Sequence, residues 1–157
     1  MPQTLEPLLR DHEFFAGLDP AYLTLIAGCA KNVVFPENTF LFREGEPADK
    51  FYLVREGMMA LEVAAPSRGH ITVQTFAAGD VMGFSWLVAP RHRYQFDGRT
   101  VERTRALEMD GACLRGKCEA DPRLGYELMR RFAALASDML QATRLRLLDV
   151  YGHANAG

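Results

Sequence analysis

Side chains that commonly bind metals or carry out catalysis are scattered along this chain of 157 residues. Its four histidines lie far apart, and no His-x-His or Cys-x-x-Cys pair supplies the spacing that zinc sites use. No nucleophile stands beside a base in an arrangement typical of covalent catalysis, and Ser85 has only His92 near it. The sequence therefore predicts no metal, no resident cofactor and no enzymatic activity.

A second group of side chains suggests binding instead. Aromatic residues gather around one stretch of the chain, at Phe84, Trp86, Tyr94 and Phe96. Directly after them come a carboxylate and a guanidinium, Asp97 and Arg99. Alternate residues of a strand share a face, so Asp97 and Arg99 are expected on the same side of one strand. Such a pair can form an ion pair, or its arginine can hold an anion.

Composition narrows the class of protein. Hydrophobic residues make up 48% of the chain and charged residues 24%, as in an ordinary globular domain. A net charge of −2 gives no general attraction to nucleic acid or to anionic membranes. No apolar run approaches the roughly 18 residues of a membrane span, and the N-terminus does not resemble a signal peptide. The scattered Cys29, Cys113 and Cys118 are expected to be reduced thiols, which is typical of the cytoplasm.

The elements that position these side chains change along the chain. Asp19 and Pro20 predict the start of a short amphipathic helix. Short runs of β-branched and aromatic residues then predict strands at 33–35, 39–42, 51–54, 58–63, 71–76 and 100–109. Glycines recur between these runs at the spacing of hairpin turns. The pattern predicts a mainly β, α+β fold: an antiparallel jelly-roll barrel flanked by short N-terminal helices and one long C-terminal helix.

The predicted C-terminal helix begins at Asp121 and Pro122 and runs to about residue 150. It carries two apolar stripes. One stripe, which can cover the barrel, contains Leu124, Leu128, Phe132, Leu135 and Met139. The other needs a further partner, and the same helix of a second subunit is the simplest one. The predicted homodimer interface is therefore formed by Met129, Ala133, Ala136, Leu140 and Leu147.

Three stretches of the chain resemble the cyclic-nucleotide-binding domain of catabolite-activator-type bacterial regulators. They are residues 43–57, residues 76–83 and residues 147–152, which match the family's strand motif, the turn before its phosphate-binding loop and the hinge of its long helix. The resemblance covers about residues 12–152 and implies a double-stranded β-helix with a ligand site after Gly83. The bound ligand would be a cyclic nucleotide held by a glutamate, an arginine and polar side chains of the long helix.

The residues at these positions depart from the family's pattern. Phe84 stands where the glutamate would accept a hydrogen bond from ribose, and matching the following strand places Asp97 where the arginine belongs. The base-contacting positions fall near Met139 and Leu140, which are apolar. Cyclic nucleotide binding in the family's manner is therefore not expected. The predicted diverged pocket consists of Gly83, Phe84, Ser85, Trp86, Leu87, Asp97, Arg99, Thr100 and Met139.

Three functions stay open on these residues. The first is a dimeric sensor or adaptor domain with a diverged pocket that responds to a small ligand or an unidentified protein partner. The second is a structural interaction module whose own aromatic side chains fill the pocket. The third is a cAMP or cGMP binder in which Arg99, or Arg91 and Arg93, replaces the family's arginine. These two side chains can also simply form an ion pair between Asp97 and Arg99, an interpretation of their spacing that requires no ligand.

The resemblance also bears on the organisation of the chain. Related regulators continue beyond the hinge into a helix-turn-helix DNA reader, for which residues 153–157 are too short. The expected division is an N-terminal helical segment at 1–31, a barrel at 32–110, two helices at 111–152 and a tail at 153–157. A stand-alone sensing domain that does not bind DNA directly is expected.

Overall fold

The computed structural model describes residues 5–67, 69–83, 86 and 93–155. Short helical segments open the fold: α1 (Glu6–Asp11), the 3-10 turn η1 (Glu13–Phe15) and α2 (Pro20–Ala27). The Asp19 side chain caps α2 by accepting a hydrogen bond from the Ala21 N–H at 2.9 Å, and Pro20 occupies the first turn. The predicted start of this helix is confirmed.

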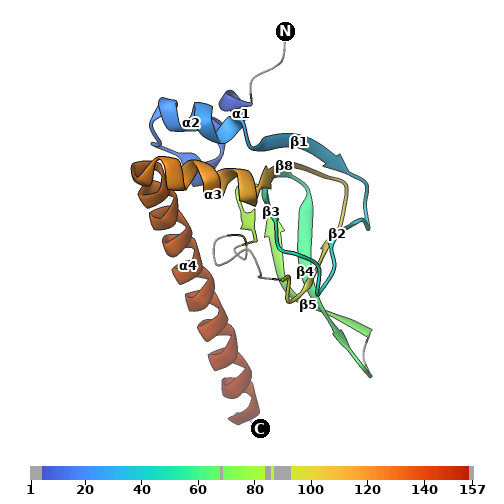
Figure 1. The fold of residues 1–157 in the computed structure, drawn as a ribbon. Helices are drawn as coiled ribbons and strands as arrows, with labels where there is room; N and C mark the ends of the chain where they lie inside the picture. Colours follow the sequence, from blue (N-terminus) through green and yellow to red (C-terminus); the bar gives the residue numbers. More distant parts are fainter. Residues whose placement is uncertain (1–4, 68, 84–85, 87–92, 156–157) are drawn as a thin grey trace.

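Antiparallel strands form two sheets on one side of the molecule, and α4 runs along the other side (Figure 1). One sheet has the order β1-β8-β3-β6 and the other the order β2-β7-β4-β5. Their arrangement confirms the predicted jelly-roll barrel. The strands are β1 (Ala30–Phe35), β2 (Phe40–Phe42), β3 (Lys50–Glu56), β4 (Met58–Ala65), β5 (Gly69–Ala77), β6 (Val81–Met82), β7 (Asp97–Thr100) and β8 (Thr104–Asp110).

One predicted strand is in fact two. The run 100–109 was expected to be continuous, but β7 ends at Thr100 and β8 begins at Thr104. Between them the Thr104 hydroxyl donates to the Glu102 carbonyl at 2.8 Å, a local bond that favours a turn. The chain crosses here from one sheet to the other. Strand β6 was not predicted, because two residues are too few to show an alternating pattern.

Strand β3 is buried on both faces and separates two parts of the core. Phe51 and Leu53 pack against the helices, together with Trp86, Leu114, Leu128 and Phe132. Tyr52 and Val54 point the other way, into the barrel, where they pack with Phe42, Met59, Phe76, Met82 and Tyr94. This double burial explains the unbroken apolar run at 51–54, because a strand with one exposed face would alternate. We call the two groups the helix-side core and the barrel core.

Two helices complete the fold. The Asp110 side chain caps α3 (Gly111–Ala120) by accepting from the Cys113 N–H at 3.0 Å. Helix α4 (Pro122–Asn155) begins as predicted and continues past the expected end near residue 150. Leu124, Leu128 and Phe132 are buried, so the first predicted stripe does cover the barrel. Figure 1 shows the rest of α4 extending along one side of the molecule toward the C-terminus.

The prediction of three reduced thiols is wrong for two of them. Cys29 and Cys113 form a disulfide whose Cα atoms are 5.7 Å apart, whereas Cys118 is free. The bridge ties the end of the N-terminal helical segment to the first turn of α3. Sequence spacing could not reveal this pair, because 84 residues separate the two cysteines and the fold alone brings them together.

Candidate functional site

A cavity of about 300 Å³ opens between the second sheet and α4. It continues the barrel core toward the helix, and Met139 of α4 forms part of its wall. Of the residues predicted for the pocket, the described lining contains Gly83 and Met139. The full described lining is Phe42, Leu61, Val73, Gln74, Phe76, Gly83, Tyr94, Gln95, Phe96 and Met139.

Gly83 is the last described residue before the segment expected to hold a ligand. Its φ is +113°, a conformation that favours glycine. A Cβ at this position would lie 3.1 Å from the Cβ of Phe51. Close packing against β3 therefore already requires a glycine here. Phe84, Ser85 and Leu87, the next predicted site residues, lie outside the described residues.

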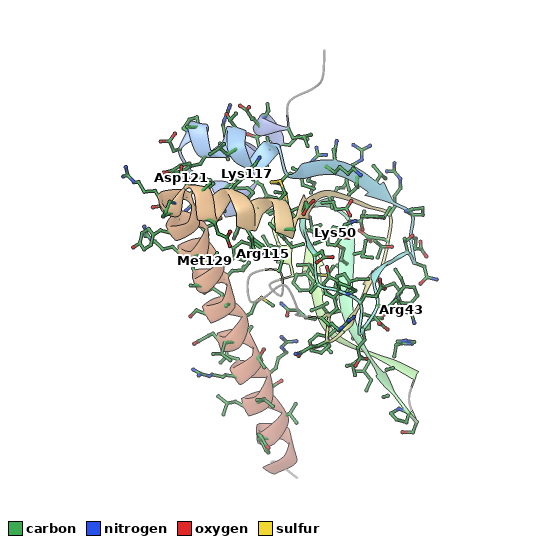
Figure 2. All side chains as sticks on the ribbon, in the orientation of Figure 1. Arg43, Lys50, Arg115, Lys117, Asp121 and Met129 are labelled. Atoms are coloured by element: carbon green, nitrogen blue, oxygen red, sulfur yellow. A yellow bond between two sulfur atoms is a disulfide. The ribbon has the colours of Figure 1, made fainter. Side chains whose placement is uncertain are left out.

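Trp86 lies in the helix-side core rather than in the cavity. It is fully buried, with its ring stacked on Phe51 at 4.7 Å and edge-on to Phe132 of α4 at 5.3 Å between centroids. Arg115 of α3 (Figure 2) donates a hydrogen bond to the Trp86 carbonyl. Trp86 thus contacts both α3 and α4, and the cavity is not filled by its indole ring.

Asp97 is buried and held by groups other than Arg99. Its carboxylate accepts a hydrogen bond from the Glu44 backbone N–H at 2.7 Å. Arg43 (Figure 2) lies 3.5 Å away through Nε, and His70 lies 3.6 Å away through Nε2. Asp97 is not among the residues lining the cavity. The sequence match places Asp97 at the position of the family's arginine. Its side chain is therefore not at the cavity wall.

The predicted ion pair between Asp97 and Arg99 is wrong. Arg99 forms two hydrogen bonds to Glu62 of β4, at 2.7 Å from Nε and 2.8 Å from Nη2. A further bond of 2.9 Å joins its Nη1 to Asn38. These hydrogen bonds from Arg99 hold the pKa of Glu62 below its usual value. Glu62 lies opposite Asp97 in the sheet register, so the neighbouring strand supplies the carboxylate that sequence spacing alone assigned to Asp97.

Thr100 has a structural role at the end of β7. Its hydroxyl donates to the Pro36 carbonyl at 2.7 Å and accepts from the Thr39 N–H at 2.8 Å. Arg93, considered as an alternative cation, donates to the Gly45 carbonyl at 2.7 Å. Neither residue lines the cavity, and Arg91 lies outside the described residues.

Most of the described cavity wall comes from residues that were not predicted to belong to a site. Leu61, Val73, Gln74, Phe76 and Gln95 come from strands and a loop that the prediction treated as architecture alone. A β-bulge explains two of them: the register of β4 and β5 shifts after Leu61, so consecutive residues Val73 and Gln74 both reach the cavity. An alternating pattern predicts only one residue of such a pair.

The predicted dimer residues are all on the exposed side of α4. Met129, Ala133, Ala136, Leu140 and Leu147 have exposed side chains, and Leu140 and Leu147 are 52% and 54% accessible. Beyond residue 139 the helix has further exposed apolar residues: Leu145, Leu148, Val150 and Tyr151. Nothing in the described part of the single chain covers this stripe.

The described residues contain no group of three histidine, cysteine or acidic side chains that could hold a metal ion. None of the described helices is long and apolar enough to cross a membrane.

Comparison with known proteins places this architecture in a family. A curated relative, the CRP-like cAMP-activated global transcriptional regulator of Mycobacterium tuberculosis, is 25% identical over 129 residues. That match covers 82% of this chain but only 57% of the regulator. An uncharacterized NTE family protein of Mycobacterium bovis is 27% identical over 149 residues, covering 95% of this chain and 25% of that protein.

Solved structures agree with these matches. A protein from Geobacter metallireducens, assigned as a cyclic nucleotide-binding protein, superposes with a TM-score of 0.76 and 30% identity. The superposition covers 86% of this chain and 97% of that structure. The family model described as "Cyclic nucleotide-binding domain" matches residues 32–121, which span the barrel and α3. This chain belongs to the cyclic nucleotide-binding domain family.

Proposed function

We propose that this protein is a regulatory sensor domain that binds a small molecule in the cavity beside α4 and signals as a dimer. It acts by binding and not by catalysis, and it does not read DNA itself. The observation that carries the proposal is the double role of α4. One face of this helix supplies Met139 to the cavity wall, and the other face exposes the apolar stripe predicted to dimerise.

A second contact supports coupling between the cavity and the helix. Arg146 lies on the exposed part of α4 and donates from Nη1 to the Val73 carbonyl at 2.9 Å. Val73 belongs to the bulge that lines the cavity. A ligand that moves the bulge or Met139 therefore acts on α4 at two points. A ligand that contacts these groups differently in two packings of α4 shifts the equilibrium toward the packing that it binds better.

The structure weighs against the two alternative functions. A self-filled interaction module is disfavoured by a cavity of about 300 Å³, which is close to the lower end of small-molecule sites. A cyclic nucleotide binder using Arg99 is disfavoured because Arg99 is held by Glu62 and is not in the cavity lining. If Arg99 left this pair to hold a ligand, the buried Glu62 carboxylate would lose its cation.

We also propose that the protein lies in the cytoplasm, where its family's regulators meet small signalling molecules. Cell fractionation is expected to recover it with cytoplasmic proteins. Disulfides such as Cys29–Cys113 persist mainly in oxidising compartments, so recovery of the protein from such a compartment would contradict the assignment.

A ligand screen by thermal unfolding tests the sensor proposal. The screen contains cAMP, cGMP, cyclic dinucleotides and small aromatic compounds. A specific ligand at 100 times its Kd is expected to add about 2.7 kcal/mol of stability and to raise Tm. If no compound shifts Tm, the interaction module becomes the better description. A shift with cAMP that disappears in Arg99→Ala, while the variant's own Tm stays near wild type, would support the cyclic nucleotide binder.

A further inference from the structure

The walls of the cavity beside α4 are almost entirely apolar or aromatic. Among the described lining residues no side chain carries a formal charge. A cyclic phosphate is normally held by an arginine or by a cluster of backbone N–H groups. The described part of this cavity supplies no such cation, and its shape is set by rings and aliphatic groups.

Two of the aromatic lining residues stack on each other. Phe42 and Tyr94 have ring centroids 3.8 Å apart and ring planes at 10°. The Tyr94 hydroxyl donates to the Lys50 carbonyl at 2.7 Å, so the polar end of the side chain is already bonded to β3. Burial raises the pKa of Tyr94 to about 12, which keeps the phenol neutral. The pair therefore contributes uncharged aromatic groups to the wall, which another ring can contact.

Two amide side chains supply the polar groups. Gln74 and Gln95 line the cavity, and neither side chain has a hydrogen-bond partner among the described residues. Each amide can both donate and accept. Their position among apolar walls is the common pattern in small-molecule sites, where a few polar groups fix the orientation of a mostly apolar ligand.

Charged side chains of both signs lie beside the cavity without belonging to its described lining. A smaller adjoining cavity shares Gln74, Phe76 and Met139 with it and adds the carboxylates of Asp80 and Asp138. Arg146 approaches from outside and donates to the Val73 carbonyl, but it is not a lining residue.

We propose that this cavity binds a small uncharged molecule with a flat aromatic ring and at least one hydrogen-bonding group, and not a cyclic nucleotide. The ring stacks beside the Phe42–Tyr94 pair, and the amides of Gln74 and Gln95 bond its polar group. The inference rests on the proposed sensor function, because it assigns a ligand class to the same cavity.

The test uses N-phenyl-1-naphthylamine, an uncharged aromatic amine whose fluorescence rises in apolar sites. It is excited at a wavelength that tryptophan does not absorb. Wild-type protein is expected to bind it saturably, and excess cAMP or cGMP is expected not to displace it. Val73→Trp, which places a large ring in the cavity, should weaken binding by about tenfold or more.

Two control variants locate the binding site. Ile71→Trp changes an exposed residue of the same strand that is not in the described lining, and it should leave affinity within about twofold of wild type. Leu148→Ser tests the exposed apolar part of α4 as a rival site for the dye, at a residue outside the predicted interface, and it should also leave binding unchanged. Equal weakening by Val73→Trp and Ile71→Trp, or loss in Leu148→Ser, overturns the cavity assignment.

The outcomes separate this inference from the sensor proposal. If cAMP or cGMP binds and displaces the dye, and Val73→Trp abolishes both, the cavity is a sensory site but the uncharged ligand class is wrong. If neither the dye nor any cyclic nucleotide binds, the inference fails and the sensor proposal loses its ligand site. If Val73→Trp does not fold, Gln74→Leu replaces it. That variant should weaken binding of the dye, because it removes an amide proposed to bond the dye's N–H. Unchanged affinity in Gln74→Leu would contradict the polar part of the proposal.

Discussion

His12 shows how a single residue in this protein can make stability depend on pH. The side chain is buried, its Nδ1 accepts from the Phe14 N–H at 3.2 Å, and its Nε2 lies 3.2 Å from the Val54 carbonyl. These bonds require the neutral ring with the proton on Nε2. Burial lowers the pKa of His12, although the Val54 carbonyl and the carboxylates of Glu13 and Asp80 act in the opposite direction.

Stability is therefore expected to fall as the solution is acidified through the normal range of histidine. A lowered pKa in the folded state means that the unfolded chain binds the proton more readily. The contribution is fully present above about pH 6.5 and is lost as pH falls below that value. For one proton, the slope cannot exceed about 1.4 kcal/mol per pH unit.

Urea unfolding at pH 7.5 and pH 5.5 measures this effect. His12→Asn retains a polar side chain but cannot titrate, so its loss of stability between the two pH values should be smaller than that of wild type. Leu9→Ala is the control, because Leu9 is buried in the helix-side core and cannot titrate; the variant should be less stable at both pH values while its pH dependence follows wild type. Identical pH dependence of wild type and His12→Asn would contradict the assignment.

Single-residue roles were predicted correctly where a side chain bonds to the backbone of its own neighbours in sequence. Asp19 and Asp121 were placed as helix caps from their position before proline, and both side chains accept backbone N–H groups. The partners of Arg99 could not be found in this way. Glu62 comes from another strand, and only the register between β4 and β7 brings the two side chains together.

Among the elements, the disulfide adds a covalent link between parts of the fold that already meet through packing and through a hydrogen bond from Lys117 to the Leu25 carbonyl. It joins the segment after α2 to α3, across 84 residues of sequence. Closing a loop of this size restricts the unfolded chain, and removing such bridges commonly costs about 2–5 kcal/mol. The bridge should therefore be a large part of the protein's net stability.

Loss of the bridge is expected to lower the free energy of unfolding by about 2–5 kcal/mol in Cys29→Ser. Urea unfolding with and without a reductant measures it: reductant should destabilise wild type but not the variant. Cys118→Ser is the control and should keep the reductant effect, because Cys118 is free. A thiol assay on unfolded protein should find one thiol before reduction and three after it. Three thiols before reduction would show that the bridge is absent.

Element prediction was best for α4 and for strands with strong patterns. The cap at Asp121 and the buried stripe of α4 were visible because a helix of this length repeats its pattern many times. The bulge in β5 was not, although it determines that Val73 and Gln74 both line the cavity. A register shift depends on the partner strand, so the sequence of one strand does not contain it.

At the scale of the whole molecule, the exposed stripe of α4 has no partner within the described part of the chain. Apolar side chains at 52–67% accessibility continue over the second half of the helix. Two copies of the helix packed side by side would bury this stripe, and a charge placed in the seam would be buried without a counter-ion.

Leu140→Asp is therefore expected to convert a dimer into a monomer. Light scattering coupled to size-exclusion chromatography should give one chain mass for the variant and twice that mass for wild type. Gln141→Asp adds the same charge at the neighbouring exposed residue outside the predicted interface, and it should remain dimeric. A monomeric wild type, or dissociation by both substitutions, would contradict an interface centred on Leu140.

The overall architecture was the part most fully predicted from sequence. Glycine spacing, apolar strand runs and the long helix all pointed to the same barrel, and these signals agree because each repeats along the chain. The candidate site was only partly predicted. It is assembled from β2, β4, β5, the loop before β7 and α4, so its lining depends on how distant segments meet.

The Cys29–Cys113 bridge also divides the molecule covalently. Every described strand lies between the two cysteines, so the barrel is enclosed within a single ring of chain, whereas α4 is a linear tail attached outside it. A single proteolytic cut inside the ring, for example near the tip of the β4–β5 hairpin, leaves both fragments joined through sulfur. A cut after Cys113 instead leaves α4 attached to the barrel only through non-covalent contacts, among them its buried stripe and Met139 at the cavity wall. The strands that line the cavity and the segment proposed to dimerise are thus covalently joined through a single backbone connection.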